Sequence, residues 1–217
     1  MDAVTPFTVF TIFGVSVSST VVATWAAMAI IIGSVIILGK FKPLFLQDLV
    51  DFLSNLVSDI MNIESVEPYL PFLGSLAIFL AVANIFGSFP LFSSPTSDLS
   101  TPVALALVVF FTVHVFGVRS QGFFGYLKDL ASPIFMLPLE IVSQISRTIS
   151  LAARLFGNIL SGDLIVAVIM SLVPLFVPVV MMGLSLLIGL LQAYVFTALA
   201  SVYIASALEV TAGEMNQ

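Results

Sequence analysis

The 217-residue sequence has no cysteine, and His114 is its one histidine. Without cysteine the chain cannot form disulfide bonds, thiolate metal sites or a cysteine nucleophile. A histidine-based metal or catalytic centre is not expected either. The glycine-rich phosphate-binding motifs and the GxSxG motif of serine hydrolases are also missing from the sequence. We therefore expect the chain to be non-catalytic by itself, with no metal and no cofactor.

Charged residues are scarce as well, at 8% of the chain against roughly 25% in a soluble domain. The six basic residues form no cluster and the net charge is −6, so no nucleic-acid partner is expected. Hydrophobic residues make up 60%, and residues 3–39, 68–97, 99–118 and 164–208 contain no charge. A helix of about 20 apolar residues crosses a hydrocarbon core of roughly 30 Å. The sequence therefore predicts an all-α polytopic membrane protein, with transport as the default class.

The first of three predicted upright spans lies within residues 16–39. Lys40 and Lys42 follow it directly, which places this end in the cytoplasm and the amino terminus outside. No cleavable signal peptide is expected, because the apolar run before Lys40 is far longer than the core of a signal sequence.

Residues 69–118 are predicted to form a hairpin of two further spans, joined by a polar turn at 93–100. Arg119 and Lys128 follow this hairpin, which agrees with the orientation of the first span and with a cytoplasmic carboxy terminus. His114 lies one turn from the cytoplasmic end. We expect it to pack and bond against a neighbouring helix; a role in ion relay is the alternative.

Residues 44–66, after Pro43, have the pattern of an amphipathic helix in the membrane interface. Every polar residue of Phe45–Ile63 falls on one face at steps of three and four, namely Gln47, Asp48, Asp51, Ser54, Asn55, Ser58, Asp59 and Asn62. This face is acidic, which is unusual for a helix that binds anionic lipid. Two interpretations stay open: the face contacts another subunit, or it is solvated without a partner.

The last two predicted helices, residues 130–172 and 174–209, are too long to stand upright. At 1.5 Å per residue, residues 139–172 alone measure about 51 Å, and a tilt of about 20° accommodates little of the excess over the membrane core. The turn between the helices, around Pro174 and Pro178, lies inside an uncharged run. We expect a strongly tilted, membrane-embedded helical hairpin.

The first helix of this hairpin carries a polar stripe. Its members recur at steps of three, four and seven and so share one face: Glu140, Gln144, Arg147, Ser150, Arg154, Asn158 and Ser161. A charged side chain at the bilayer centre is unfavourable by roughly 2.5–3.5 kcal/mol even on the lenient insertion scale. The stripe must therefore face protein or water, and its residues are functional candidates.

Arg154 is the central residue of the stripe. A guanidinium is effectively always charged, and no carboxylate stands three or four residues from Arg154. Its counter-charge is expected from a titratable acid on another chain; pairing with Glu140 or Asp163 through the fold is the alternative. In the second helix, Ser185 and Gln192 are seven residues apart and both can face the stripe, where a glutamine commonly bonds across helices.

These residues resemble the a subunit of F-type rotary ATP synthases. The sequence RLFGN at residues 154–158, followed by SGDLI at 161–165, is similar to the arginine signature of that family. LQAYVF at residues 191–196, with Tyr203 after it, is similar to the family's last helix. The resemblance covers most of the chain from about Lys40 onward. It is to the prokaryotic type and is closest to a divergent branch associated with sodium transport.

The resemblance implies a role in a larger complex. In that family the a subunit is the stator of a proton or sodium channel and lies against a ring of c subunits, with b-type peripheral stalk subunits and the rest of the synthase as further partners. Arg154 matches the essential arginine, which keeps each ring carboxylate ionised as it passes and blocks short-circuiting between two offset half-channels. The other positions expected to line or support the ion path are Asn158, Asp163, Gln192, Glu140, Arg147, Ser161 and Glu209.

Two positions depart from the family pattern. Asp163 stands where Glu or His is common, and Ser185 stands where some members have a histidine, so the details of the pathway stay open. The resemblance further implies the inner membrane of a prokaryotic cell, with an organelle inner membrane as the alternative. The identity of the ion is set largely by the c ring, which is another chain.

Two other classes of membrane protein fit the sequence less well. A secondary ion-coupled carrier predicts an internal repeat, but the polar stripe has no counterpart in the first half of the sequence. A structural scaffold gives no reason for Arg154, Asn158 and Gln192 to lie in a membrane-embedded hairpin.

Overall fold

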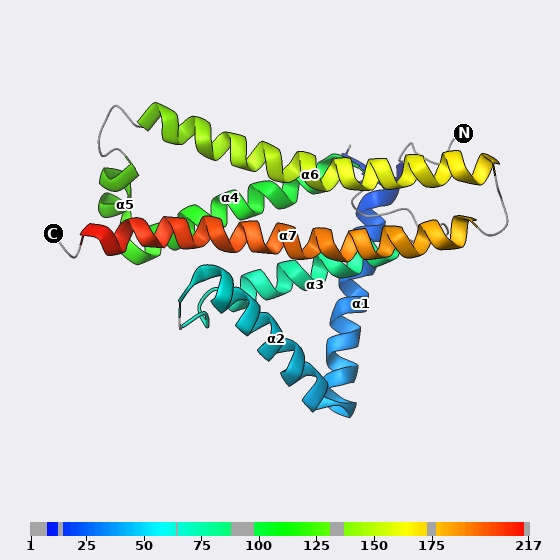
Figure 1. Cartoon of the computed structure of the whole chain (residues 1–217), viewed down its shortest axis with the longest axis horizontal. Helices are drawn as coiled ribbons and strands as arrows, with labels where there is room; N and C mark the ends of the chain where they lie inside the picture. Colours follow the sequence, from blue (N-terminus) through cyan, green and yellow to red (C-terminus); the bar gives the residue numbers. More distant parts are fainter. Residues whose placement is uncertain are drawn as a thin grey trace.

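The structure is a computed structural model in which residues 8–12, 15–63, 65–87, 98–130, 137–172 and 177–214 are described (Figure 1). Within these residues the chain forms a short β-hairpin and seven α-helices. In chain order the elements are β1 (Thr8–Ile12), β2 (Val15–Ser18), α1 (Ser19–Phe41), α2 (Pro43–Met61), α3 (Leu70–Gly87), α4 (Ser100–Gln121), α5 (Phe123–Leu130), α6 (Leu137–Leu172) and α7 (Val177–Glu214). Most of the predicted polar turn at 93–100 lies outside the described residues.

Four helices contain a stretch that is long and apolar enough to cross a membrane. These stretches are Thr20–Phe41 in α1, Leu70–Gly87 in α3, Ser100–Ser120 in α4 and Val179–Leu208 in α7. The prediction of an all-α polytopic membrane protein is thereby confirmed. One small element was not predicted: β1 and β2 pair antiparallel ahead of α1, in a segment rich in the β-branched residues that strands favour.

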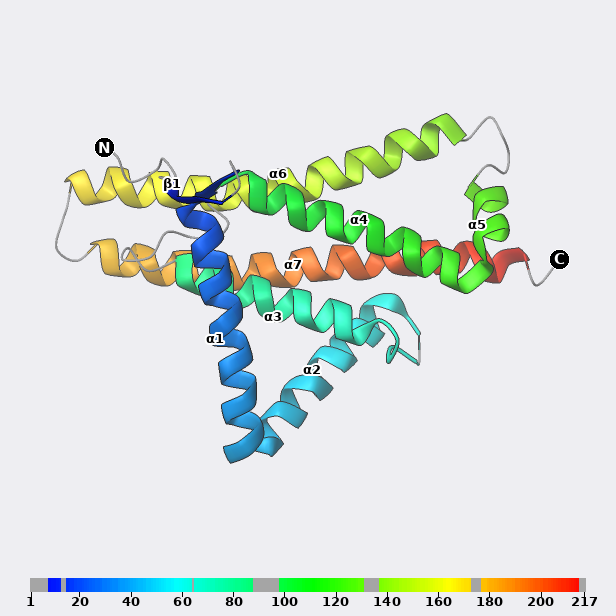
Figure 2. The same cartoon turned by 180° about the vertical axis from the view of Figure 1, so that it is seen from behind.

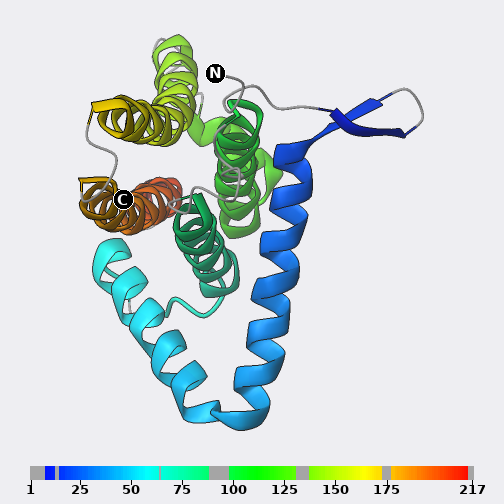
Figure 3. The same cartoon turned by 90° about the vertical axis from the view of Figure 1, so that its right-hand side faces the viewer.

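Helix α7 is the centre of the fold, in contact with α2, α3, α4 and α6. Helix α6 runs antiparallel beside α7, and α3 and α4 extend along the same direction (Figures 1 and 2). Helix α1 crosses this group, so that an end-on view of the four helices shows α1 from the side (Figure 3).

The three predicted upright spans do not share one direction in the structure. Helices α3 and α4 share the direction of the long hairpin and not that of α1, because they bury their inner faces along α7. The long hairpin and helices α3 and α4 therefore form one group of four helices that share a direction.

Helices α1 and α2 meet in a V that projects from this group (Figure 3). Pro43 stands in the first turn of α2, where its missing N–H would have had no intrahelical partner. The helix ends at Asn62, which adopts the left-handed conformation with φ 53°, a common way to stop a helix. Leu53, Val57 and Met61 on one side of α2 are buried, which attaches its carboxyl half to the rest of the fold.

The short helix α5 was also not predicted. Gly122 has φ 76°, a value that favours glycine, and its N–H donates to the Val118 carbonyl at 2.8 Å, which ends α4 and turns the chain. Helix α6 then begins at Leu137 and α7 at Val177, whereas the predicted helices begin at residues 130 and 174. Residues 131–136 and 173–176 lie outside the described residues.

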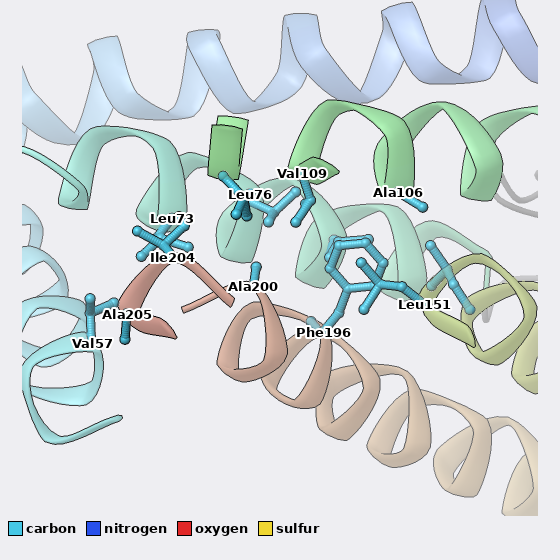
Figure 4. Close-up of a cluster of buried hydrophobic side chains, with 14 of the residues drawn as sticks. Val57, Leu73, Leu76, Ala106, Val109, Leu151, Phe196, Ala200, Ile204 and Ala205 are labelled. Atoms are coloured by element: carbon cyan, nitrogen blue, oxygen red, sulfur yellow. The ribbon is translucent and has the colours of Figure 1, made fainter. Parts of the chain in front are cut away.

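The core is one cluster of apolar side chains arranged around α7 (Figure 4). Helix α7 contributes Phe196, Ala200, Ile204 and Ala205, and the residues that converge on them are Val57, Leu73, Leu76, Ala106, Val109 and Leu151. The alanines let neighbouring helices approach closely, which matters in a bilayer because packing rather than water exclusion holds helices together there. The core thus fixes which face of α6 turns inward.

Candidate functional site

The candidate site is the face of α6 that no described part of the chain covers. Helices α4 and α7 cover its other side. The exposed side chains recur at steps of three and four and define what we call the outer face: Val142, Ile145, Ser146, Ile149, Ser150, Ala153, Arg154, Ser161, Ile165 and Val168. Most of these residues are aliphatic or small. Arg154 is the only charged residue among them.

Arg154 lies at the middle of the outer face, with small residues around it. Ala153 is exposed beside it, and a Cβ atom added at Gly157 would meet nothing within 4 Å. Within the part of the chain that the structure describes, Arg154 makes no hydrogen bond and no ion pair. The helix therefore presents a permanent positive charge outward, on a surface that another helix can approach closely.

The alternative partners of Arg154 within the chain have different surroundings. The Glu140 carboxylate accepts a hydrogen bond of 3.1 Å from the Gln144 amide, one turn along the same helix, and is not paired with Arg154. The side chain of Asp163 lies outside the described set, as does that of Glu209. The prediction of a counter-charge from another chain stays a prediction.

The surroundings of Arg147 differ from those of Arg154, although both residues belong to the predicted stripe. Arg147 is half-buried, and its guanidinium carbon lies 5.4 Å from the centroid of the Tyr203 ring on α7. This is a cation–π distance. The stripe thus divides, with Arg154 and Ser161 facing outward and Glu140, Arg147 and Asn158 half-buried.

Gln192 lies on the inner side of α7 and is 8% exposed. Its amide nitrogen is buried and has no hydrogen-bond partner within the described residues. An unpaired buried amide is unfavourable by about 1–3 kcal/mol. Ser185, seven residues before Gln192, is half-buried. It faces Gly162 of α6, because a Cβ atom added at Gly162 would lie 3.9 Å from the Ser185 hydroxyl.

Asn84 is a buried polar residue that the sequence analysis did not single out. Its amide donates a hydrogen bond of 2.8 Å from α3 to the carbonyl of Gly189 on α7, one turn before Gln192. The available signal was an asparagine inside an otherwise apolar run, since such residues bond across helices in membranes.

His114 packs against aromatic residues. Its Nδ1 lies 2.7 Å from the carbonyl of Phe110, and because a carbonyl can only accept, Nδ1 carries the proton. The ring centroid of Phe110 is 4.3 Å away and that of Tyr126 on α5 is 5.9 Å away. The contact with Tyr126 agrees with the expected packing against a neighbouring helix, whereas the hydrogen bond is made within α4 itself and not to a neighbouring helix.

The polar face predicted for α2 is largely exposed, including Gln47, Asp48, Asp51, Asn55 and Asp59. On the opposite side only the carboxyl half is buried, at Leu53, Val57 and Met61, whereas Phe45 and Phe52 of the predicted apolar face are exposed. The amphipathic pattern therefore corresponds to a helix with an open polar face and an apolar face that is attached only in its second half. Helix α2 packs on α1, α3 and α7, so its acidic face is a different surface from the outer face of α6.

Comparison with known proteins identifies the family. The family model described as ATP synthase A chain matches residues 8–205. ATP synthase subunit a 2 of Bradyrhizobium sp. (strain BTAi1) is 44% identical over 207 residues, which cover 92% of this chain and 92% of that protein. ATP synthase subunit a 2 of a Picosynechococcus strain is 44% identical over 206 residues, covering 90% and 88%, and ATP synthase subunit a of Albidiferax ferrireducens is 40% identical over 199, covering 88% and 86%. The chain therefore belongs to the ATP synthase A chain family, as a multi-pass subunit of the membrane sector of an F-type ATP synthase.

Proposed function

We propose that this chain is the stator ion-channel subunit of its synthase. It provides two offset half-channels and one essential arginine, Arg154, which together couple the flow of H⁺ or Na⁺ to rotation of a c ring. Synthesis or hydrolysis of ATP takes place on other subunits. The observation that carries the proposal is the exposed Arg154 at the centre of the outer face of α6, which has no ion pair within the described residues.

A fixed cation on this face acts as an electrostatic gate. An adjacent positive charge favours the ionised form of a carboxylate, so a ring carboxylate that reaches Arg154 gives up its ion before it passes. An ion cannot take the same route because the guanidinium repels it. Each ion that crosses gains about 2.3 kcal/mol per 100 mV, and this energy drives rotation only if leakage past Arg154 is slow.

The remaining polar residues serve the half-channels or support the gate. Asn158, one turn beyond Arg154, is suited to bind water or the transported ion, and the Gln192 amide nitrogen, which has no partner within the described residues, is suited to donate a hydrogen bond to water. Ser161 is the last residue of the stripe, and Asp163 follows two residues later on another side of the helix. Glu140, Arg147 and Glu209 lie toward the cytoplasmic end and support the hairpin there.

The partners follow from the two open surfaces. The outer face of α6 faces the c ring, whose carboxylates supply the counter-charge of Arg154. The acidic face of α2 lies at the cytoplasmic surface, where b-type stalk subunits are expected. The amino terminus then lies outside the cell and the carboxy terminus in the cytoplasm, in the inner membrane of a prokaryote.

The test replaces Arg154 in the complete synthase. Arg154→Gln is expected to reduce ATP synthesis, driven by an imposed ion gradient in membrane vesicles, to background, and to increase passive ion leakage after the soluble head is removed. Arg119→Gln is the matched control, because Arg119 is an exposed arginine at the end of α4 and not on the outer face. A normal synthesis rate in Arg154→Gln would refute the gate.

Purification of the tagged chain from its native membrane is a second test. The proposal predicts recovery with a ring of small, carboxylate-bearing subunits and a soluble ATPase head. Recovery of the chain alone would leave Arg154 without an acidic partner and would favour a carrier.

A further inference from the structure

The two arginines of α6 stand where both could attract a passing ring carboxylate. Arg147 and Arg154 are seven residues apart, about 10.5 Å along the helix axis, and a step of seven drifts by only about 20° around it. An ideal straight helix would therefore present both cations to the same side. A passing carboxylate would then meet two attractive positions instead of one.

The structure separates the two side chains. Arg154 is exposed on the outer face, whereas Arg147 is half-buried with its guanidinium carbon 5.4 Å from the centre of the Tyr203 ring. Tyr203 is itself packed against the buried core cluster, so its ring has a fixed position on α7. An arginine over an aromatic face is attracted to the ring quadrupole, most strongly where water is excluded.

The outer face beside Arg147 carries no charge. The outer-face residues at this level of α6 are Val142, Ile145, Ser146, Ile149 and Ser150. Among the α6 residues whose side chains are described, Arg154 is the only charged residue on the exposed side. The outer face therefore carries only apolar or small side chains at the point that a second arginine could otherwise reach.

We propose that Tyr203 is a positioning residue that holds Arg147 away from the rotor, so that Arg154 is the single cation on the path of the ring carboxylates. The inference rests on the function proposed above and concerns the same face. Without the ring, the flexible Arg147 side chain turns toward the outer face, where it attracts an ionised carboxylate two turns before the gate and repels the transported cation. Turnover then slows although Arg154 is intact.

The test uses the complete synthase in membrane vesicles, with ATP synthesis driven by an imposed ion gradient. Tyr203→Met, which removes the ring at similar volume, is expected to lower the rate about three- to tenfold, while Tyr203→Phe keeps the ring and is expected to stay within about twofold of the unmodified enzyme. The decisive variant is Tyr203→Met combined with Arg147→Gln. Its rate is expected to return to that of Arg147→Gln alone.

The double variant separates positioning from packing. It carries the same altered packing at residue 203 as Tyr203→Met, so a merely structural role predicts that it stays as slow. That result, or a normal rate in an assembled Tyr203→Met complex, would overturn the inference. If Tyr203→Met does not assemble, fluorinated phenylalanines at position 203 keep the shape of the ring and weaken its quadrupole; the rate must then fall stepwise with fluorination, and a constant rate would overturn the inference.

Arg154→Gln, measured in the same assay, distinguishes a failure of the proposed function from a failure of the role assigned to Tyr203. If it still makes ATP, the proposed function is wrong and the inference falls with it. If it is inactive while Tyr203→Met is normal, only the role of Tyr203 is refuted.

Discussion

The side-chain amide of Asn84 on α3 donates a hydrogen bond of 2.8 Å to the carbonyl of Gly189 on α7, at a point where α7 has no side chain. A Cβ atom added at residue 189 would lie only 2.9 Å from the Cβ of Asn84. The two residues thus bring α3 and α7 into close contact one turn from Gln192.

Gly189→Ala is predicted to destabilise the subunit. The new methyl group cannot be accommodated without moving α3 from α7, and overpacking of this kind is typically unfavourable by about 1–3 kcal/mol. Thermal unfolding of the detergent-solubilised protein would measure the change. Gly183→Ala is the matched control on the same helix, since nothing lies within 4 Å of its added Cβ and alanine favours a helix by about 1 kcal/mol over glycine. Equal melting temperatures for the two variants would contradict the prediction.

Phe196→Ala is predicted to be more harmful. Phe196 is fully buried at the centre of the core (Figure 4), and removal of such a ring leaves a cavity at a loss of about 3–5 kcal/mol. Leu191→Ala serves as the comparison because Leu191 is 54% exposed on the same helix. We expect the first variant, and not the second, to fail to accumulate in membranes, as judged by the amount of intact subunit. Similar amounts of both would show that the core does not lie where Figure 4 places it.

Gly157→Leu is predicted to slow turnover without harming the fold. Nothing in the described chain lies within 4 Å of a Cβ at this position, so the subunit itself has room for the larger side chain. A c ring that slides past the outer face has no such room. An overpacking penalty of about 1–3 kcal/mol corresponds to a rate that is lower by roughly 5–150-fold. The measurement is ATP synthesis by the assembled complex. Gly33→Leu on α1, which also meets open space, should leave the rate unchanged; a normal rate in Gly157→Leu would argue against the assigned face.

The orientation is testable by cysteine labelling, because the natural chain contains no cysteine. Asp51→Cys on the exposed face of α2 is predicted to react with a membrane-impermeant maleimide in inverted vesicles and to be protected in right-side-out vesicles. Ser16→Cys, ahead of α1, is predicted to show the opposite pattern. The same pattern at both positions would exclude α1 as a single crossing between them.

The sequence predicted the elements whose signals repeat over many residues. The two long helices follow from their uninterrupted length, and the face of α2 follows from polar residues at regular steps. The hairpin β1–β2 and the helix α5 were missed because each depends on a few residues and on a local turn, such as the one that Gly122 makes. Short elements carry too few repeats to define a period.

The division of the polar stripe could not have been predicted. Periodicity assigns Arg147 and Arg154 to one face of the helix. In the structure Arg147 instead lies over the ring of Tyr203, which is fifty-six residues later in the chain. The direction of α3 and α4 was missed for a related reason. Hydropathy measures how apolar a span is, whereas its tilt is set by the neighbours against which it packs.

Helix α1 has few contacts with the rest of the chain, since only 6% of its most apolar stretch is buried. It carries no charge before Lys40, and as a helix it satisfies its own backbone hydrogen bonds. We therefore expect α1 to enter the lipid as soon as it is synthesised. Helix α6 cannot do so, because its arginines are unfavourable in lipid and the ring that shelters Arg147 belongs to α7. During biosynthesis, α6 is expected to stay with the insertion machinery until α7 has been made.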